Sequence, residues 1–256
     1  MERVMIFKIV IWAVAAVLFL VPVLMVSALV VSPNRQYQTN SKYYRFLLDF
    51  STAIALLLCR VKVTVKGAEK LPQDSRLLLV SNHRSKFDPI VTWYAFQEHR
   101  LSFVSKPENL RIPIFGRIIR RCCFLPIDRE NARNAMSTIN AAAKLLESGE
   151  VSVGIYPEGT RNYGDGLLPF HNGVFKIAKK AQSPIAVVAV SGTDKIHANW
   201  PRRGTEVTVH VLEVFSAEAV SEMKTAQIGA RVRELLDEAL TAKETKLCGK
   251  VSGINL

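Results

Sequence analysis

The chain has 256 residues, of which 49% are hydrophobic, and its formal net charge is +12. This composition excludes a disordered chain, and the length is sufficient for one globular core. The excess of Lys and Arg suits a nucleic acid, an anionic membrane or a phosphorylated small molecule as partner. A charge that only keeps the protein soluble is the simplest alternative.

The N-terminal region contains a long stretch without charge, residues 9–31, which reads IVIWAVAAVLFLVPVLMVSALVV. A helix of this length is long enough to cross a hydrocarbon core at ~1.5 Å per residue. A secretory signal would have a shorter apolar region, and a buried helix of a soluble protein is rarely apolar on every face. The stretch therefore predicts a membrane anchor.

A second apolar segment, residues 43–59, follows a polar connector at 32–42. Asp49 interrupts this segment, and its uninterrupted part is too short to span a bilayer alone. It could lie in the membrane interface, return as half of a helical hairpin, or form a core helix of the next domain. We expect residues 1–60 to form the anchoring part and residues 61–256 to form the folded domain.

After residue 60 the pattern changes to strands that alternate with helices. Six short runs have the character of strands: 61–67, 77–82, 102–106, 151–156, 185–190 and 207–213. Four stretches have helical character: 89–97, about 131–148, about 171–182 and about 218–243. This alternation predicts an α/β fold with a mainly parallel central sheet flanked by helices.

The four cysteines show no disulfide or zinc pattern. Cys122 and Cys123 are adjacent, whereas Cys59 and Cys248 are isolated. This usage is typical of a reducing compartment, and inert thiols are a simpler interpretation than a nucleophile.

A possible catalytic pair follows the second predicted strand, where residues 81–89 read SNHRSKFDP. Asp88 and Pro89 suit the start of a helix, and an N-cap role alone would explain Asp88. His83 would then lie at the carboxyl end of a strand, where open α/β sheets bind ligands. A carboxylate beside a histidine can fix its tautomer, which leaves the second ring nitrogen free to act as a base.

Two further segments carry polar groups that could bind an anion. Residues 155–162 read IYPEGTRN, in which the guanidinium of Arg161 could hold a phosphate, although a salt-bridged turn with Glu158 would also explain the pattern. Residues 105–129 place Lys106, Arg111, Arg117, Arg120 and Arg121 beside apolar residues, which suits an anionic amphiphile or a membrane surface. A solvated basic face is the simpler alternative for any single arginine.

Three of these segments together resemble the glycerolipid acyltransferases of the lysophosphatidic acid acyltransferase type, also called 1-acylglycerol-3-phosphate acyltransferases. The motifs are NHRSKFD (82–88), KPENLRIPIFG (106–116) and YPEGTR (156–161), and the resemblance covers roughly residues 60–215. It implies that His83 is the general base and Asp88 its orienting partner. It also implies that Lys106 and Arg161 hold the acceptor phosphate, while Glu158, Gly159 and Thr160 shape the acceptor site.

The same resemblance implies a reaction. An acyl group would move from acyl-CoA or acyl carrier protein to the sn-2 hydroxyl of 1-acylglycerol 3-phosphate, which forms phosphatidic acid for phospholipid synthesis. It implies no metal and no other cofactor. We expect no nucleic-acid partner either, because the sequence shows no aromatic and basic module of the kind that binds nucleic acid. With the predicted anchor the enzyme would be membrane-bound, and the thioester donor implies that its catalytic domain, residues 61–256, faces the cytoplasm.

Two alternatives stay open. Because related enzymes share the motifs, the acceptor could be glycerol 3-phosphate or another lysolipid. The chain could instead be a membrane-tethered protein that only binds anionic lipid. It also departs from the family pattern at Val187, where a proline is usual, and at Phe170-His171-Asn172-Gly173, where a lysine commonly takes the second place. We expect His171 to be a surface loop residue, although it could line the site.

Overall fold

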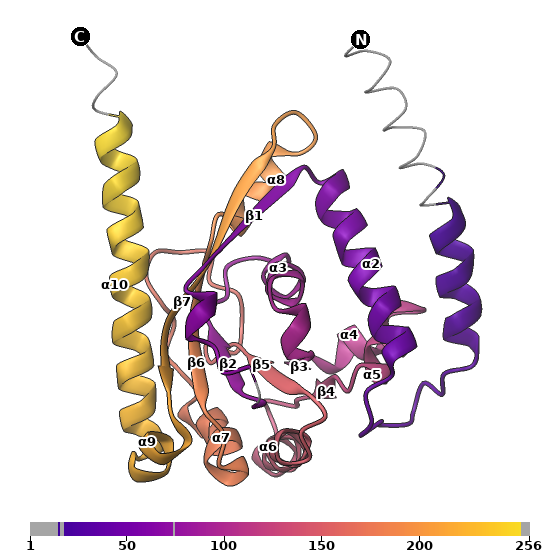
Figure 1. The fold of residues 1–256 in the computed structure, drawn as a ribbon, viewed down its shortest axis with the longest axis horizontal. Helices are drawn as coiled ribbons and strands as arrows, with labels where there is room; N and C mark the ends of the chain where they lie inside the picture. Colours follow the sequence, from indigo (N-terminus) through magenta and orange to yellow (C-terminus); the bar gives the residue numbers. More distant parts are fainter. Residues whose placement is uncertain (1–14, 16–17, 74, 252–256) are drawn as a thin grey trace.

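The computed structural model describes residues 15, 18–73 and 75–251. In this part of the chain a seven-stranded sheet forms the centre, in the order β1-β7-β6-β2-β5-β3-β4 (Figure 1). Its strands are β1 (Val61–Lys66), β2 (Leu78–Ser81), β3 (Leu101–Ser105), β4 (Leu125–Pro126), β5 (Ser152–Ile155), β6 (Ile185–Ser191) and β7 (Thr205–Phe215). The described strand pairs are parallel except β6 with β7. The predicted α/β fold with a mainly parallel sheet is therefore confirmed, and β4 is an addition to it.

Helices cover both faces of the sheet. They are α2 (Lys42–Leu58), α3 (Asp88–Ala95), α4 (Pro107–Arg111), α5 (Phe115–Arg121), α6 (Ala132–Glu147), α7 (Lys176–Ala181), α8 (Ile196–Asn199), α9 (Ala217–Glu222) and α10 (Thr225–Val251). Two of the predicted helices are divided. Residues 171–182 form a 3-10 turn followed by α7, and residues 218–243 belong to α9 and α10.

Two hydrophobic clusters hold these three layers together. Because successive residues of a strand point to opposite faces, Leu78 and Val80 join the cluster beneath α6, α7 and α10, whereas Leu77 and Leu79 join the cluster beneath α2, α3 and α5. On α10, Ile228, Val232 and Leu236 are fully buried, as their helical spacing predicts.

Helix α2 packs against the folded domain through both apolar and polar residues, and its Leu47, Leu48 and Leu56 belong to the core cluster. The Asp49 carboxylate accepts a hydrogen bond from Trp93 Nε1 at 2.6 Å, and the buried Arg45 donates to the Leu101 carbonyl at 3.0 Å. Its outward face carries exposed apolar side chains, which include Phe46, Phe50 and Leu57. Helix α2 is therefore apolar on its outward face as well as on the face that packs on the domain, unlike an ordinary amphipathic surface helix.

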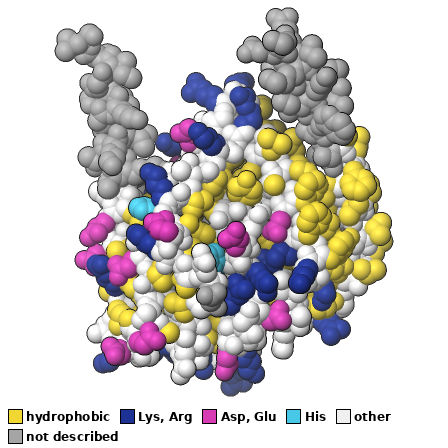
Figure 2. All heavy atoms as spheres, in the orientation of Figure 1, with side chains coloured by type: hydrophobic (Ala, Val, Ile, Leu, Met, Phe, Trp, Pro, Cys, Tyr) yellow, Lys and Arg dark blue, Asp and Glu magenta, His cyan; other side chains and the backbone are white. Residues whose placement is uncertain are grey.

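The N-terminal region adds to this apolar surface. Residues 18–29 are helical, and Leu18, Phe19, Val26, Leu29 and Val30 are exposed. Figure 2 shows hydrophobic side chains gathered on this side of the molecule, next to a group of Lys and Arg side chains. Such a surface exceeds what isolated exposed apolar residues produce on a soluble protein.

The predicted anchor at residues 9–31 begins outside the described residues. Within the part that the structure describes, no helix has both the length and the apolar character needed to cross a membrane.

Candidate active site

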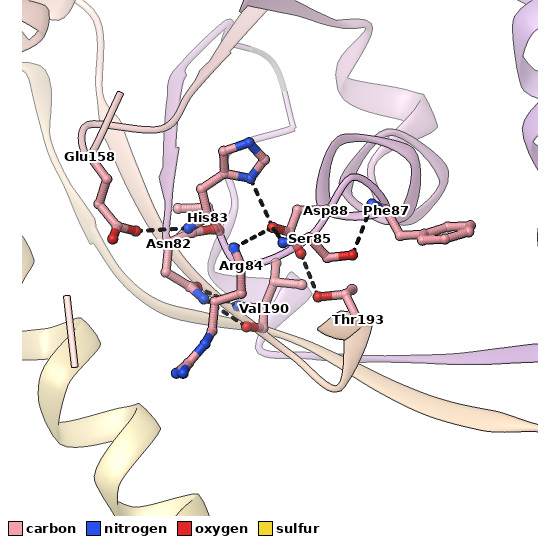
Figure 3. Close-up of polar contacts among 10 residues, drawn as sticks. Asn82, His83, Arg84, Ser85, Phe87, Asp88, Glu158, Val190 and Thr193 are labelled. Carbon is pink, nitrogen blue, oxygen red and sulfur yellow. Dashed lines mark hydrogen bonds and ion pairs between the residues drawn. The ribbon is translucent and has the colours of Figure 1, made fainter. Parts of the chain in front are cut away.

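His83 and Asp88 meet in the loop that leaves the carboxyl end of β2 (Figure 3). The distance between His83 Nδ1 and Asp88 Oδ2 is 2.8 Å. The Asp88 side chain is fully buried, whereas 17% of the His83 side chain is exposed. A buried carboxylate therefore holds one ring nitrogen, and the other ring nitrogen is left to face a substrate.

The Asp88 carboxylate is held by four donors. Its Oδ2 accepts from the backbone amides of Arg84 at 2.6 Å and Ser85 at 2.7 Å, in addition to His83, and its Oδ1 accepts from the Thr193 hydroxyl. These bonds compensate for the burial of a charged group. Helix α3 begins at Asp88 and its N-cap is Phe87, so the expectation that Asp88 is the N-cap was wrong by one position.

Glu158 fixes the backbone of the same loop. Its two carboxylate oxygens accept from the His83 amide at 2.8 Å and from the Leu168 amide at 3.0 Å. The backbone N–H of Asn162 donates to the His83 carbonyl at 2.8 Å, so both the backbone N–H and the carbonyl of His83 are hydrogen-bonded. Burial raises the pKa of Glu158, and the two backbone bonds partly oppose this rise.

Tyr156 supports the His83 ring from one side. The His83 and Tyr156 rings stack with centroids 4.3 Å apart and an interplanar angle of 19°, and the Phe103 ring also stacks with Tyr156, with centroids 6.0 Å apart. Burial strongly raises the pKa of Tyr156, and the nearby Asp88 carboxylate raises it further. Tyr156 is therefore a neutral packing surface for the imidazole.

A cavity of about 730 Å³ opens beside His83. Its polar lining includes Lys106, Thr160, Arg161 and His171, and Gly159 forms part of the wall. The apolar lining includes residues of β3, α5, α6 and the segment between α5 and α6, among them Phe103, Phe115, Ile119, Phe124, Ile127 and Ile139. This combination of cationic and apolar walls fits an amphiphile with an anionic head.

The predicted site residues occupy different positions around this cavity. Lys106 and Thr160 are exposed and Arg161 is half-buried, and all three line the cavity. Glu158 lies behind the loop instead and acts through the His83 backbone. Gly159 has φ +72°, and a Cβ there would lie 2.9 Å from the His171 ring, so a larger residue would be strained and crowded.

The two departures from the family pattern fall in different places. His171 is exposed on a loop, as expected, and it also lines the cavity, which was the alternative. Val187 is fully buried in β6 and belongs to the core.

Four further residues contribute to the site without having been predicted. Arg129 lines the cavity, and Thr193 and Tyr156 contact the His83–Asp88 pair. Asn82 exchanges two hydrogen bonds of 2.8 Å with the backbone of Val190, which ties the end of β2 to β6. Asn82 and Tyr156 stand inside the quoted motifs, whereas nothing in the sequence marks Thr193.

The cysteines near the site are unsuited to nucleophilic attack. Burial raises the pKa of Cys122 to about 12 and that of Cys123 to about 11, which disfavours both thiolates. Among the described residues, no three His, Cys, Asp or Glu side chains are grouped so that they could hold a metal ion.

The fold and the site together define an α/β enzyme with a His–Asp pair beside an amphiphilic cavity. Residues 62–191 match the model of the acyltransferase family. The chain therefore belongs to the acyltransferase family, and its motifs resemble those of the branch that acts on lysophosphatidic acid.

Proteins of similar sequence carry names that agree with membership of this family. The chain is 31% identical over 197 residues to a 1-acyl-sn-glycerol-3-phosphate acyltransferase of Salmonella typhimurium, which covers 75% of this chain and 80% of that protein. It is 29% identical over 188 residues to the Haemophilus influenzae protein of the same name, with 72% and 78% covered. The human protein named 1-acyl-sn-glycerol-3-phosphate acyltransferase alpha is 26% identical over 228 residues, with 79% and 80% covered.

A solved structure shares the fold. The crystal structure of the 1-acyl-sn-glycerophosphate acyltransferase from Thermotoga maritima superposes with a TM-score of 0.68. The match covers 95% of this chain and 98% of that one at 19% sequence identity.

Proposed function

We propose that this acyltransferase moves a fatty acyl group from a thioester donor to the sn-2 hydroxyl of 1-acylglycerol 3-phosphate and so forms phosphatidic acid. The observation that carries the proposal is the position of His83. It is held by a buried carboxylate at 2.8 Å and opens onto a cavity with both cationic and apolar walls. The relatives named for this reaction support the same substrate.

In the proposed mechanism His83 acts as a general base. Its Nδ1 donates to Asp88, so Nε2 can take the proton from the acceptor hydroxyl. The oxygen then attacks the thioester carbonyl and a tetrahedral oxyanion forms. When it collapses, the carbon–sulfur bond breaks, and the thiolate leaves with the proton that His83 returns. The transfer is direct and forms no acyl-enzyme.

The acceptor phosphate would be held by the cationic side of the cavity. Lys106, Arg129 and Arg161 line it, and an arginine fork binds phosphate oxygens in pairs. A phosphate held by these side chains would orient the reacting hydroxyl of the same acceptor molecule toward His83. Gly159 and Thr160 shape the same wall, while Glu158 holds the loop on which His83 stands.

The apolar outer surface would place the enzyme on a membrane. The exposed apolar residues of the N-terminal helix and α2 would enter the interface, where the amphiphilic acceptor and product reside. The donor, acyl-CoA or acyl carrier protein, would reach the catalytic domain from the cytoplasm. Residues 1–60 would provide this attachment and residues 61–256 the catalytic domain.

The test is transfer of a labelled palmitoyl group by the purified full chain in lipid or detergent. Palmitoyl-CoA and palmitoyl-acyl carrier protein are offered as donors, with 1-acylglycerol 3-phosphate, glycerol 3-phosphate and lysophosphatidylcholine as competing acceptors. Labelled phosphatidic acid as the main product supports the proposal. Preference for either competing acceptor would assign another substrate, and the absence of transfer by folded protein would favour a lipid-binding role.

A further inference from the structure

A second cavity, of about 660 Å³, lies between the N-terminal helix and the segment that carries α4 and α5. It shares no lining residue with the catalytic cavity. Its walls include Met25, Leu29, Arg111, Ile112, Arg117 and Arg120. No residue used in the proposed mechanism belongs to this set.

Three arginines give this cavity a single sign of charge. Arg111, Arg117 and Arg120 line it, and the described lining residues include no Asp or Glu. Arg117 Nη1 donates to the Ala28 carbonyl at 3.2 Å, which joins α5 to the N-terminal helix. Three guanidinium groups without a carboxylate in the lining are complementary to a phosphate.

Arg120 is the arginine whose environment most favours an added anion. Its Nε is buried and has no hydrogen-bond partner within the described part of the chain. Burial also lowers the pKa of Arg120, because the charged form is poorly solvated. A buried donor without a partner is costly, and a phosphate oxygen could satisfy it.

The rim of the cavity is apolar and exposed. Leu29 is 75% exposed, Met25 is 49% exposed and Ile112 is 45% exposed. Met25 and Leu29 belong to the N-terminal helix, whose other exposed apolar residues form the apolar surface described above. A ligand that bears a phosphate and an acyl chain would cover both the arginines and this rim, whereas a free phosphate would leave the rim in water.

We propose that this second cavity binds the phosphate headgroup of an anionic diacyl glycerophospholipid of the membrane, separately from the reacting acceptor. The proposal rests on the proposed attachment of the enzyme to a membrane. Phe115 and Ile119 of α5 line the catalytic cavity, while Arg117 and Arg120 of the same helix line the second one. A bound headgroup would therefore hold the N-terminal helix against a wall of the active site.

The test measures binding of dihexanoyl-phosphatidylglycerol to the full chain by calorimetry, below its micelle concentration. Binding should be saturable, and dihexanoyl-phosphatidylcholine should bind at least tenfold more weakly. The double variant Arg111→Gln/Arg120→Gln should weaken phosphatidylglycerol binding at least tenfold. The variant Arg133→Gln/Lys144→Gln removes two exposed charges from α6 and should leave the affinity within twofold.

A second pair of measurements separates this site from the active site and from membrane attachment. Lys106→Gln/Arg161→Gln alters the catalytic cavity and should retain phosphatidylglycerol binding. Loss of binding in that variant, equal binding of phosphatidylcholine, or displacement of the lipid by equimolar inorganic phosphate would overturn the proposal. Sedimentation with neutral vesicles tests attachment separately, so a protein that binds monomeric lipid but no vesicle retains the site and loses the attachment.

Discussion

Replacement of Asp88 by asparagine isolates the charge of the carboxylate from its shape. Asp88 Oδ2 accepts three hydrogen bonds, and an amide oxygen in the same place can accept them all. The amide nitrogen would then face the Thr193 hydroxyl, which can rotate to accept instead of donate. The variant should therefore fold, but the negative charge beside His83 is lost.

The size of the effect follows from the burial of this pair. The Asp88 side chain is fully buried and lies 2.8 Å from the His83 ring, so the imidazolium formed during proton transfer loses its nearest counter-charge in a poorly solvated site. We expect kcat to fall by about 10²–10⁴, which corresponds to ~3–5 kcal/mol in the barrier. KM for the lysolipid should change little, because the groups proposed to bind its phosphate are intact.

The assay is initial-rate acyl transfer from palmitoyl-CoA, followed by release of the free thiol. Circular dichroism and the unfolding temperature confirm that the variant is folded. Asp194→Asn is the matched control, because it makes the same change on an exposed neighbour of Thr193. A folded Asp88→Asn enzyme that keeps more than a tenth of the parent kcat would refute the proposed role of the carboxylate.

Three other predictions follow from the packing and the charges. Because the folded state raises the pKa of Glu158, the unfolding free energy of the parent should decline relative to Glu158→Gln as pH rises from 4.5 toward that raised value. A Cβ at Gly154 would clash with the Phe103 ring, so Gly154→Ala should lower the unfolding free energy by ~1–3 kcal/mol in denaturant titrations. Phe46→Ser/Phe50→Ser removes an exposed stacked pair and should reduce sedimentation with anionic vesicles several-fold.

Each of these predictions has a matched comparison. If the unfolding free energies of Glu158→Gln and the parent change with pH in parallel, the raised pKa of Glu158 is contradicted. Gly173 has no atom within 4 Å of an added Cβ, so Gly173→Ala should be tolerated where Gly154→Ala is not. Tyr163→Ser removes an aromatic ring that is 77% exposed and lies outside the apolar helices, and equal loss of vesicle binding in this variant would contradict the role of α2.

Local patterns were sufficient to predict most of the sheet and the centre of the site. The apolar run at 77–82 and the motif that follows it predict where β2 ends and where His83 lies. The short β4 has two residues, which is too few for a periodic signal. Similarly, a break at Met223–Lys224 divides the long C-terminal helical pattern into α9 and α10, and the sequence carries no proline or glycine there to mark it.

The contacts that depend on tertiary structure could not be predicted in this way. Thr193 reaches Asp88 from the end of β6, 105 residues away, because β6 and β2 are neighbours in the sheet. Ile114 has φ +65°, a conformation in which a glycine is the usual expectation, and nothing in its local sequence indicates it. The sequence also left open which face of α2 packs on the domain, because the place of Asp49 within an apolar segment is explained only by its hydrogen bond to Trp93.

The most direct test of the central claim is acyl transfer to 1-acylglycerol 3-phosphate by His83→Ala beside the parent enzyme and His197→Ala. His197 is an exposed histidine of α8, so its replacement controls for the loss of an imidazole. The account predicts that folded His83→Ala loses at least 10²-fold in kcat, within the range that general bases contribute, while His197→Ala stays within twofold of the parent. Equal activity in the parent and in His83→Ala would contradict it.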